Sequence, residues 1–180
     1  MKRYQVIIIG KGLSALCAGV RLVELGVKDI LIVAKGVGST PAIAAINFVL
    51  PSAENGDSPR LYAEDMLRAG SYLSERELVE EMAAKSHEVY EFLVRSGVEF
   101  ARNENGTLKR RHLSGHSIPR SLCQTSGLIG IQLQNKLIEK LKASGVKMMD
   151  GECVRVLSDG KRVYGITVLD RKHFNLINNY

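Results

Sequence analysis

The first 35 residues alternate apolar runs with an amphipathic stretch. A continuous β-branched run at residues 5–9 is typical of a central parallel strand that is buried on both faces. Apolar residues then recur at helical spacing over residues 13–25, and Gly26 ends this pattern. A second apolar run follows at residues 29–34. These elements predict a right-handed βαβ unit, and therefore an α/β, Rossmann-like fold.

The middle of the chain carries a less regular pattern. Glycines and prolines make residues 36–60 irregular. Residues 60–70 and 75–96 favour helices, whereas residues 103–126 are polar and indicate a loop. The apolar face of the second helix is predicted from helical spacing and comprises Leu78, Met82, His87, Tyr90, Leu93 and Val94.

The last third predicts a helix followed by a β-hairpin. Residues 127–143 have helical spacing. Two strands are predicted at residues 146–149 and 152–157, with Gly151 between them. The turn signal Asp-Gly then leads into residues 162–169, which complete a hairpin.

Length and composition fit one folded domain. The chain has 180 residues, of which 45% are hydrophobic. We expect a domain over residues 1–170 and an irregular, asparagine-rich tail over residues 171–180. No apolar run approaches the ~18–20 residues that span a bilayer, so we expect a cytoplasmic protein without a membrane span. Cys17, Cys123 and Cys153 fit neither a disulfide framework nor a metal site, and we expect them to be buried and no metal to bind.

The net charge of +6 raises the question of a nucleic-acid partner. The basic cluster is the short segment Lys109-Arg110-Arg111-His112, which has no interleaved aromatic residues, and the chain has no Trp. A solvated or anion-facing loop is the better interpretation, and we expect no nucleic-acid binding.

The turn after the first predicted strand carries the strongest chemical signal. Gly10 permits a tight turn, Gly12 lets the backbone approach a pyrophosphate, and Ala15 allows close packing of helix on strand. Backbone N–H groups from Leu13 and Ser14 onward can bind phosphates, helped by the helix dipole. The pattern predicts a dinucleotide site; a glycine turn without a ligand is the alternative.

The second predicted strand lacks the acidic residue that binds the adenosine ribose in a standard NAD site. It ends in Val33-Ala34-Lys35-Gly36, where Lys35 either meets a phosphate or is solvated. The hydroxyls of Ser39 and Thr40 follow a glycine and can reach a pyrophosphate or a flavin ring. An ordinary Ser/Thr turn is the alternative.

A second constellation lies in the segment Gly115-His116-Ser117-Ile118-Pro119-Arg120. His116 and Arg120 can converge on a carboxylate or a flavin carbonyl, because Arg supplies planar bidentate donors. A structural loop is the alternative. These two residues are the catalytic candidates, and the catalytic residues are otherwise unknown, since the sequence has no nucleophile elbow and no metal-binding spacing.

Taken together, these residues resemble the L-aspartate oxidases, within the fumarate reductase and succinate dehydrogenase flavoprotein superfamily. The resemblance covers nearly the whole chain. It rests on Val6 to Ala15, Val33 to Gly36, Gly38-Ser39-Thr40, Ala42 to Asn47, Asp65 to Gly70, Ser96 to Phe100, and Gly115 to Arg120.

The resemblance implies a glutathione-reductase-type FAD-binding domain. It implies noncovalent FAD, because Ser39 stands where succinate dehydrogenases carry a flavin-linked histidine. The cofactor-binding residues that it implies are Gly10, Gly12, Leu13, Ser14, Ala15, Lys35, Gly36, Ser39, Thr40, Ala44, Ala45 and Val154.

The implied reaction is oxidation of L-aspartate to iminoaspartate, the first step toward quinolinate and NAD. A dicarboxylate such as L-aspartate or fumarate is the implied substrate. Ala44 and Ala45 stand where the family has two glycines near the flavin ring. Leu113 stands where many L-aspartate oxidases have a glutamate associated with the substrate amine.

The resemblance also implies an incomplete enzyme. The capping domain and C-terminal segment of the family have no counterpart in these 180 residues. We therefore expect FAD-dependent oxidoreductase chemistry only when those parts are supplied, by self-association or by a complementing chain. A fumarate reductase or succinate dehydrogenase-like fragment, and a noncatalytic FAD- or ADP-binding module that docks with another chain, are the alternatives.

Overall fold

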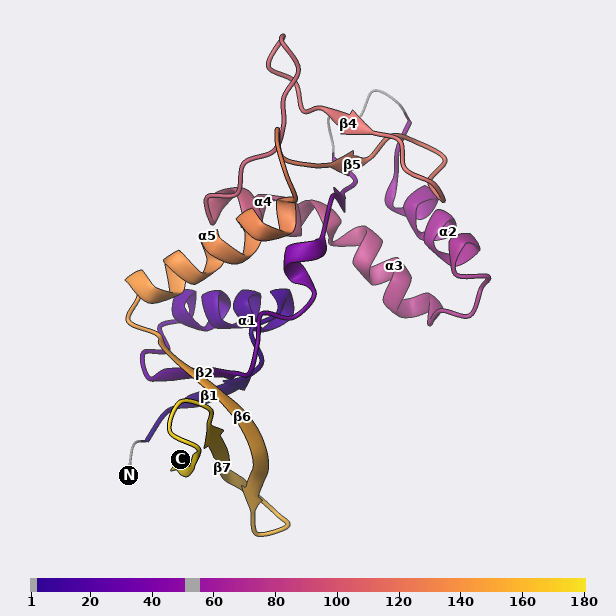
Figure 1. The fold of residues 1–180 in the computed structure, drawn as a ribbon. Coiled ribbons are helices and arrows are strands. Elements are labelled where there is room, and N and C mark those ends of the chain that lie inside the picture. The colour runs from indigo at the N-terminus through magenta and orange to yellow at the C-terminus, as the bar shows by residue number, and fades with distance from the viewer. Residues whose placement is uncertain (1–2, 51–55) are drawn as a thin grey trace. The chain divides into compact units, whose positions relative to one another are not determined.

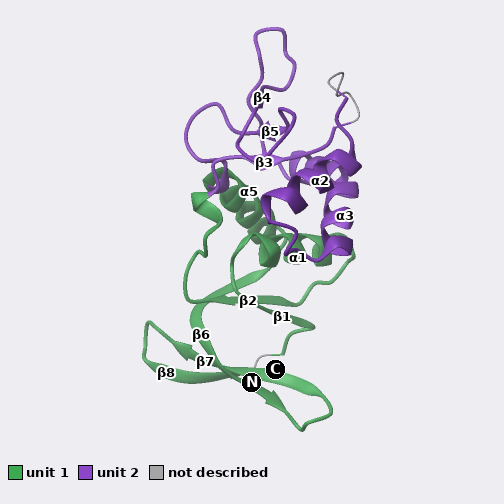
Figure 2. Cartoon of the chain, turned by 90° about the vertical axis from the view of Figure 1, so that its right-hand side faces the viewer, with its two compact units in different colours: residues 1–42, 131–180 green, residues 43–130 purple. Residues whose placement is uncertain are grey.

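The computed structural model describes residues 3–50 and 56–180. The chain divides into two compact units (Figure 2). Unit 1 comprises residues 1–42 and 131–180, and unit 2 comprises residues 43–130. Figures 1 and 2 together label the helices and strands of both units.

Unit 1 is built on a five-stranded sheet with the order β1-β2-β6-β7-β8. The bounds are Val6–Ile9 for β1, Ile30–Ala34 for β2, Lys147–Ser158 for β6, Val163–Asp170 for β7 and Asn175–Asn179 for β8. Strands β1, β2 and β6 are parallel, whereas β6, β7 and β8 pair antiparallel. The predicted α/β, Rossmann-like fold with a βαβ start and an added hairpin is confirmed.

Two helices belong to this sheet: α1, Leu13–Glu24, and α5, Ile129–Ala143, of which all but the first two residues lie in unit 1. They pack closely at Gly19, where a Cβ would lie 3.0 Å from Leu141 and 3.5 Å from Ile32 of β2. The side chains of Leu16, Leu137 and Leu141 are buried. Gly19 thus lets α1 and α5 approach closely, and Figure 1 shows the two helices side by side.

The predicted central strand at residues 5–9 is in fact an edge strand. β1 pairs with β2 alone among the described strands, and its residue Ile9 is 54% exposed. The strand that is buried along its whole length is β2. The prediction was wrong because a continuous β-branched run reports strand propensity and does not determine the strand order in a sheet.

Two further predictions in unit 1 need correction. Gly151 does not separate two strands, because β6 runs through it; a Cβ there would lie 2.5 Å from Val168 of β7, so the glycine permits close approach of the hairpin. Residues 171–180 are not an irregular tail, since β8 pairs with β7 along Asn175–Asn179. Backbone pairing with β7 makes this segment regular, although its asparagine-rich sequence does not predict a strand.

The described residues of unit 2 form the helices α2, α3 and α4 and a small three-stranded sheet in the order β3-β5-β4. The bounds are Pro59–Ala69 for α2, Arg76–Ala84 for α3, Ser86–Arg95 for α4, Ile46–Asn47 for β3, Arg110–Arg111 for β4 and Ser121–Leu122 for β5. A 3₁₀ turn, η1, at Thr40–Ala42 precedes this unit. The short strands β4 and β5 lie within the segment predicted as a loop.

The predicted helix at residues 75–96 is two helices that meet at Lys85. At this point the buried hydroxyl of Ser86 donates to the carbonyl of Ala83 at 2.8 Å and accepts from the N–H of Val49 at 3.1 Å. A side chain that bonds the backbone in this way competes with regular helix geometry.

The break also changes which side chains of α3 are buried. Leu78 and Met82 were predicted on the apolar face but are 59% and 56% exposed, whereas Val79 and Ala83 are buried. These two residues pack with Val49, Tyr62, Ala63 and Leu67 in one core cluster of unit 2. Within the described residues, no helix combines the length and the apolar character that crossing a membrane requires.

Candidate functional site

The turn between β1 and α1 has the geometry that the glycine pattern predicts. Gly10 has φ = +110°, which an L side chain rarely adopts. Its N–H donates to the carbonyl of Val33 in β2 at 2.7 Å. Gly12 then occupies the N-cap position of α1 in an extended conformation. The chain therefore turns sharply from the end of a parallel strand into a helix N-terminus.

A second loop packs against this turn. Gly38 has φ = +69°, and a Cβ on it would lie 3.4 Å from the Cα of Gly12. Thr40 is 3% exposed, and its Oγ1 accepts a hydrogen bond from the N–H of Leu13 at 2.9 Å. The loop after β2 thus touches the start of α1 through backbone and through the Thr40 hydroxyl.

The start of α1 keeps anion-binding capacity after these contacts are made. In the described part of the chain, no hydrogen-bond acceptor serves the N–H groups of Ser14 and Ala15. The first turn carries no acidic side chain that would repel an anion. A phosphate fits such a helix terminus, because the free N–H groups and the helix dipole both favour negative charge. Because Gly12 and Gly38 have no side chains, only their backbone atoms lie next to this helix terminus.

Lys35 lies just after β2 and is exposed, and its Nζ forms an ion pair with Glu152 of β6 at 2.6 Å. The hydrogen bond from Lys35 lowers the pKa of the Glu152 carboxyl below its ordinary value. A carboxylate on the neighbouring strand β6 thus lies within ion-pair distance of the residue that follows β2. Sequence reasoning missed Glu152, because only the strand order places β6 beside β2.

The remaining predicted cofactor residues are spread over both units. Gly36 and Ser39 are exposed in the loop after β2. Val154 is 50% exposed, and it lies at an irregularity of β6 between Cys153 and Arg155, where the register with β7 shifts. A residue at such a bulge is left out of the ladder and has free backbone groups. Ala44 and Ala45 belong to unit 2, where Ala44 is exposed and Ala45 is half-buried.

The second predicted constellation forms a buried charge cluster within unit 2. Arg120 is 0% exposed and binds two carboxylates that are also completely buried, Asp57 and Asp65. Its Nη2 lies 2.8 Å from Asp57 Oδ1 and its Nη1 lies 2.5 Å from Asp65 Oδ2. Its guanidinium carbon lies 4.8 Å from the ring centroid of Tyr62. All three side-chain nitrogens of Arg120 thus donate to the protein's own carboxylates.

Asp65 organises the loop that carries His116. Both the N–H and the hydroxyl of Ser117 donate to Asp65 Oδ2 at 2.8 Å, and Arg68 pairs with the other carboxylate oxygen. Burial alone raises the pKa of Asp65, but the hydrogen bonds from Ser117 and Arg120 outweigh it and hold that pKa below its ordinary value. An acid among the buried positions of α2 was the sequence signal that could have found Asp65.

His116 is joined to the same cluster. Arg120 Nη1 lies 3.0 Å from His116 Nδ1. Since a guanidinium only donates, Nδ1 is the acceptor and the proton of the neutral ring resides on Nε2. Burial and the neighbouring guanidinium lower the pKa of His116. The structure therefore brings His116 and Arg120 together within a network that stabilises its own loop, which is the arrangement of the structural-loop alternative.

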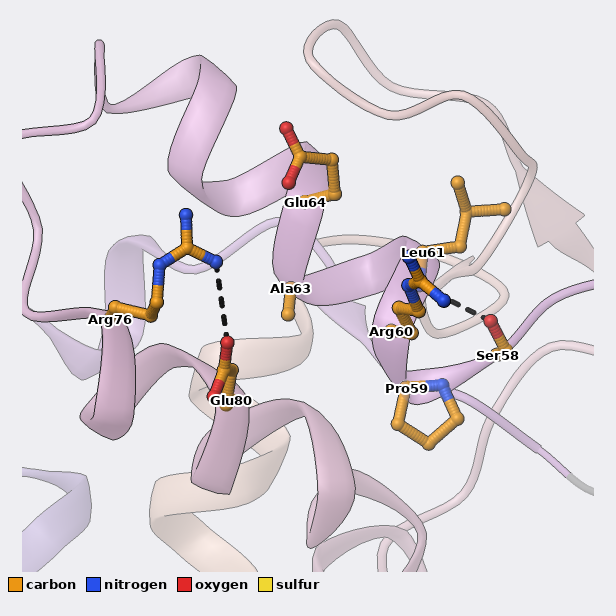
Figure 3. A pocket seen from close by; sticks show the side chains of 8 residues that line it. All are labelled: Ser58, Pro59, Arg60, Leu61, Ala63, Glu64, Arg76 and Glu80. Carbon is orange, nitrogen blue, oxygen red and sulfur yellow. Dashed lines mark hydrogen bonds and ion pairs between the residues drawn. The ribbon is translucent and has the colours of Figure 1, made fainter.

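The surface of unit 2 also has a hollow of about 620 Å³ between the start of α2 and the first turns of α3 (Figure 3). Arg76 and Glu80 of α3 pair across 3.3 Å at its edge. No predicted site residue lines this hollow.

Of the three cysteines, all free, Cys123 is buried as predicted, whereas Cys17 and Cys153 are only half-buried.

Comparison with known proteins matches residues 5–178 to the FAD binding domain family. The L-aspartate oxidase of Pyrococcus abyssi is 40% identical over 116 residues, which are 64% of this chain and 23% of that protein. The 8-methylmenaquinol:fumarate reductase flavoprotein subunit of Wolinella succinogenes is 28% identical over 172 residues, covering 92% of this chain and 28% of the relative.

Solved structures show the same fold. The Mycobacterium smegmatis Sdh1 complex in the apo form contains a chain that superposes with a TM-score of 0.86 at 20% identity. The match covers 99% of this chain and 33% of that one. The matches thus span between 23% and 33% of the length of these relatives.

The glycine turn, the open helix N-terminus and the sheet order agree with this assignment, and FAD is the cofactor that it indicates. The chain belongs to the FAD binding domain family, among the relatives of the L-aspartate oxidases and of the fumarate reductase and succinate dehydrogenase flavoproteins.

Proposed function

We propose that this chain is the N-terminal, FAD-binding portion of an L-aspartate oxidase-like flavoenzyme of the cytoplasm. The observation that carries the proposal is the pairing of a phosphate-accepting β1–α1 turn with 40% identity to an L-aspartate oxidase. The reaction is oxidation of L-aspartate to iminoaspartate, which feeds quinolinate and NAD synthesis.

In this proposal the turn Gly10–Ala15 holds the pyrophosphate of FAD at the N–H groups of α1. Lys35, Gly36 and the backbone of Val154 at its bulge would contribute further contacts to the cofactor. FAD, when bound, accepts the two electrons that leave the substrate. Binding is noncovalent, since Ser39 takes the place of a flavin-linked histidine.

Arg120 acts structurally in this proposal. A guanidinium that is completely buried and paired with two buried carboxylates is not accessible to a substrate carboxylate. The groups that bind and deprotonate L-aspartate therefore come from another part of the enzyme. That part lies outside the residues described, and the edge of β1, which no described strand pairs, is suited to receive it.

A fumarate reductase-like activity is the second candidate. It is favoured by the Wolinella succinogenes relative, which matches 92% of this chain. It is also favoured by Leu113, which stands where a glutamate is associated with the substrate amine in many L-aspartate oxidases. An enzyme that does not bind the amine would prefer an unsubstituted dicarboxylate.

The decisive experiment fuses this chain to the part of the Pyrococcus abyssi L-aspartate oxidase that it does not cover. The fusion is loaded with FAD and mixed anaerobically with L-aspartate, and flavin absorbance is followed. We expect bleaching by L-aspartate and none by succinate. Reoxidation by fumarate together with bleaching by succinate only would favour the second candidate. A fusion that holds FAD and responds to neither would refute both.

A further inference from the structure

Gln134 of α5 connects the two loops of the proposed cofactor site. Its Nε2 donates to the carbonyl of Lys11 at 3.2 Å and to the carbonyl of Val37 at 2.8 Å. The side chain is buried, with 5% exposure. All three residues belong to unit 1. Because both partners are carbonyl oxygens, only the NH₂ end of the carboxamide can face them, and its two hydrogens are shared between the two loops.

The sequence around these carbonyls explains why a tether matters. Lys11 lies between Gly10 and Gly12, and Val37 lies between Gly36 and Gly38. Glycines on both sides give each segment unusual backbone freedom, so the ordering of either loop carries a large entropic cost. Gln134 bonds the middle residue of each Gly-x-Gly segment and fixes both to the same helix. The Thr40–Leu13 hydrogen bond joins the loops independently.

We propose that Gln134 is a positioning residue that preorganises the FAD pyrophosphate site by holding the β1–α1 turn and the loop after β2 in their binding geometry. The proposal rests on the placement of FAD at the Gly10–Ala15 turn given above. Gln134 does not itself touch the phosphates in this arrangement. Its effect reaches the ligand through the backbone, as a lower cost of ordering the site.

The test compares Gln134→Glu and Gln134→Met with the wild-type chain. Glu has the same shape but turns an oxygen toward two carbonyl oxygens, and Met has neither donor. We expect the dissociation constants for FAD and for ADP, measured by fluorescence and calorimetry, to rise about tenfold in both variants, as expected for the loss of buried hydrogen bonds. Amide hydrogen exchange in the FAD-free protein should accelerate at residues 10–15 and at residues 36–40 together.

Two matched controls separate positioning from general stability and charge. Asn135→Asp adds the same negative charge at the neighbouring exposed position of α5 and should leave both dissociation constants unchanged. Leu137→Ala removes a buried side chain from the same helix. It should lower the unfolding temperature at least as much as the Gln134 variants do, with little effect on FAD affinity. If Leu137→Ala weakens FAD binding equally, general destabilisation explains the result and the positioning role is lost.

The outcomes also separate this inference from the site it depends on. Gly12→Asp places a carboxylate against the proposed phosphate position and should abolish FAD binding. If Gly12→Asp abolishes binding while Gln134→Glu leaves it unchanged, only the role of Gln134 is overturned. Faster exchange in one loop alone overturns it as well. If Gly12→Asp binds FAD normally, or if the wild type takes up no FAD alone or in the fusion, both proposals fail.

Discussion

The hydroxyl of Thr40 accepts a hydrogen bond from the N–H of Leu13 at 2.9 Å, although 27 residues separate them in the sequence. Gly12, at the N-cap of α1, has no side chain that could form this bond. The helix therefore obtains its cap from a distant loop, and the position next to the phosphate site stays free of side-chain atoms. One residue serves the stability of α1 and the geometry of the site.

Replacing Thr40 by Val should remove this cap without changing the shape of the side chain. We expect the free energy of unfolding to fall by about 1 kcal/mol, the usual cost of losing an N-cap hydroxyl, and FAD affinity to fall with it. Thr40→Ser keeps the acceptor oxygen and should stay near the wild type in both measurements. Urea unfolding and FAD titration check the pair, and equal losses in the two variants would contradict the capping role.

Removing the buried guanidinium should destabilise unit 2. In Arg120→Met, two completely buried carboxylates, Asp57 and Asp65, lose their counter-charge, and breaking a buried ion pair in this way costs about 3–5 kcal/mol. The exposed pair Arg76–Glu80 supplies the control, since Arg76→Met should cost less than about 1 kcal/mol. Urea unfolding measures both. A small effect of Arg120→Met would show that Arg120 is not structural.

The lowered pKa of His116 predicts a dependence of stability on pH. Burial and Arg120 favour the neutral ring in the folded state, so the unfolded state binds more protons below its pKa of about 6.5. The contribution of the neutral His116 ring to the free energy of unfolding is complete above pH 6.5. It is lost as the pH falls through the lower pKa of the folded state. Unfolding in urea at pH 7.5 and at pH 5.5 should show this loss. His116→Gln should reduce it, and an unchanged difference would contradict the assignment.

The unpaired edge of β1 predicts association. We expect the purified chain to form larger species as its concentration rises, and Ile9→Lys to suppress them, because a charge on an edge strand opposes pairing with another strand. Leu73→Lys is the matched control in unit 2, since Leu73 is also an exposed apolar residue. Light scattering checks all three proteins. A wild-type chain that stays monomeric at high concentration would argue against a docking edge.

Local patterns account for most of unit 1. The β-branched runs and the glycine turn predicted β1, α1 and β2 within a residue or two of their bounds, because strand and helix periods and the φ demand of Gly10 act over a few neighbours. The Asp-Gly turn likewise predicted the β6–β7 hairpin. The same residues carried the resemblance to FAD-binding proteins.

Contacts between distant residues decided the rest. The pairing of backbones places β1 at an edge of the sheet and makes β8 a strand. The sequence of neither segment determines with which strand it pairs. The roles of Asp65 and Glu152 follow from their ion pairs, with Arg120 and Lys35 respectively. Gln134 sits in an ordinary helical pattern, and only tertiary packing brings its carboxamide to the two glycine-flanked carbonyls. Sequence period fixes local conformation, whereas burial and polar partnership depend on three-dimensional neighbours.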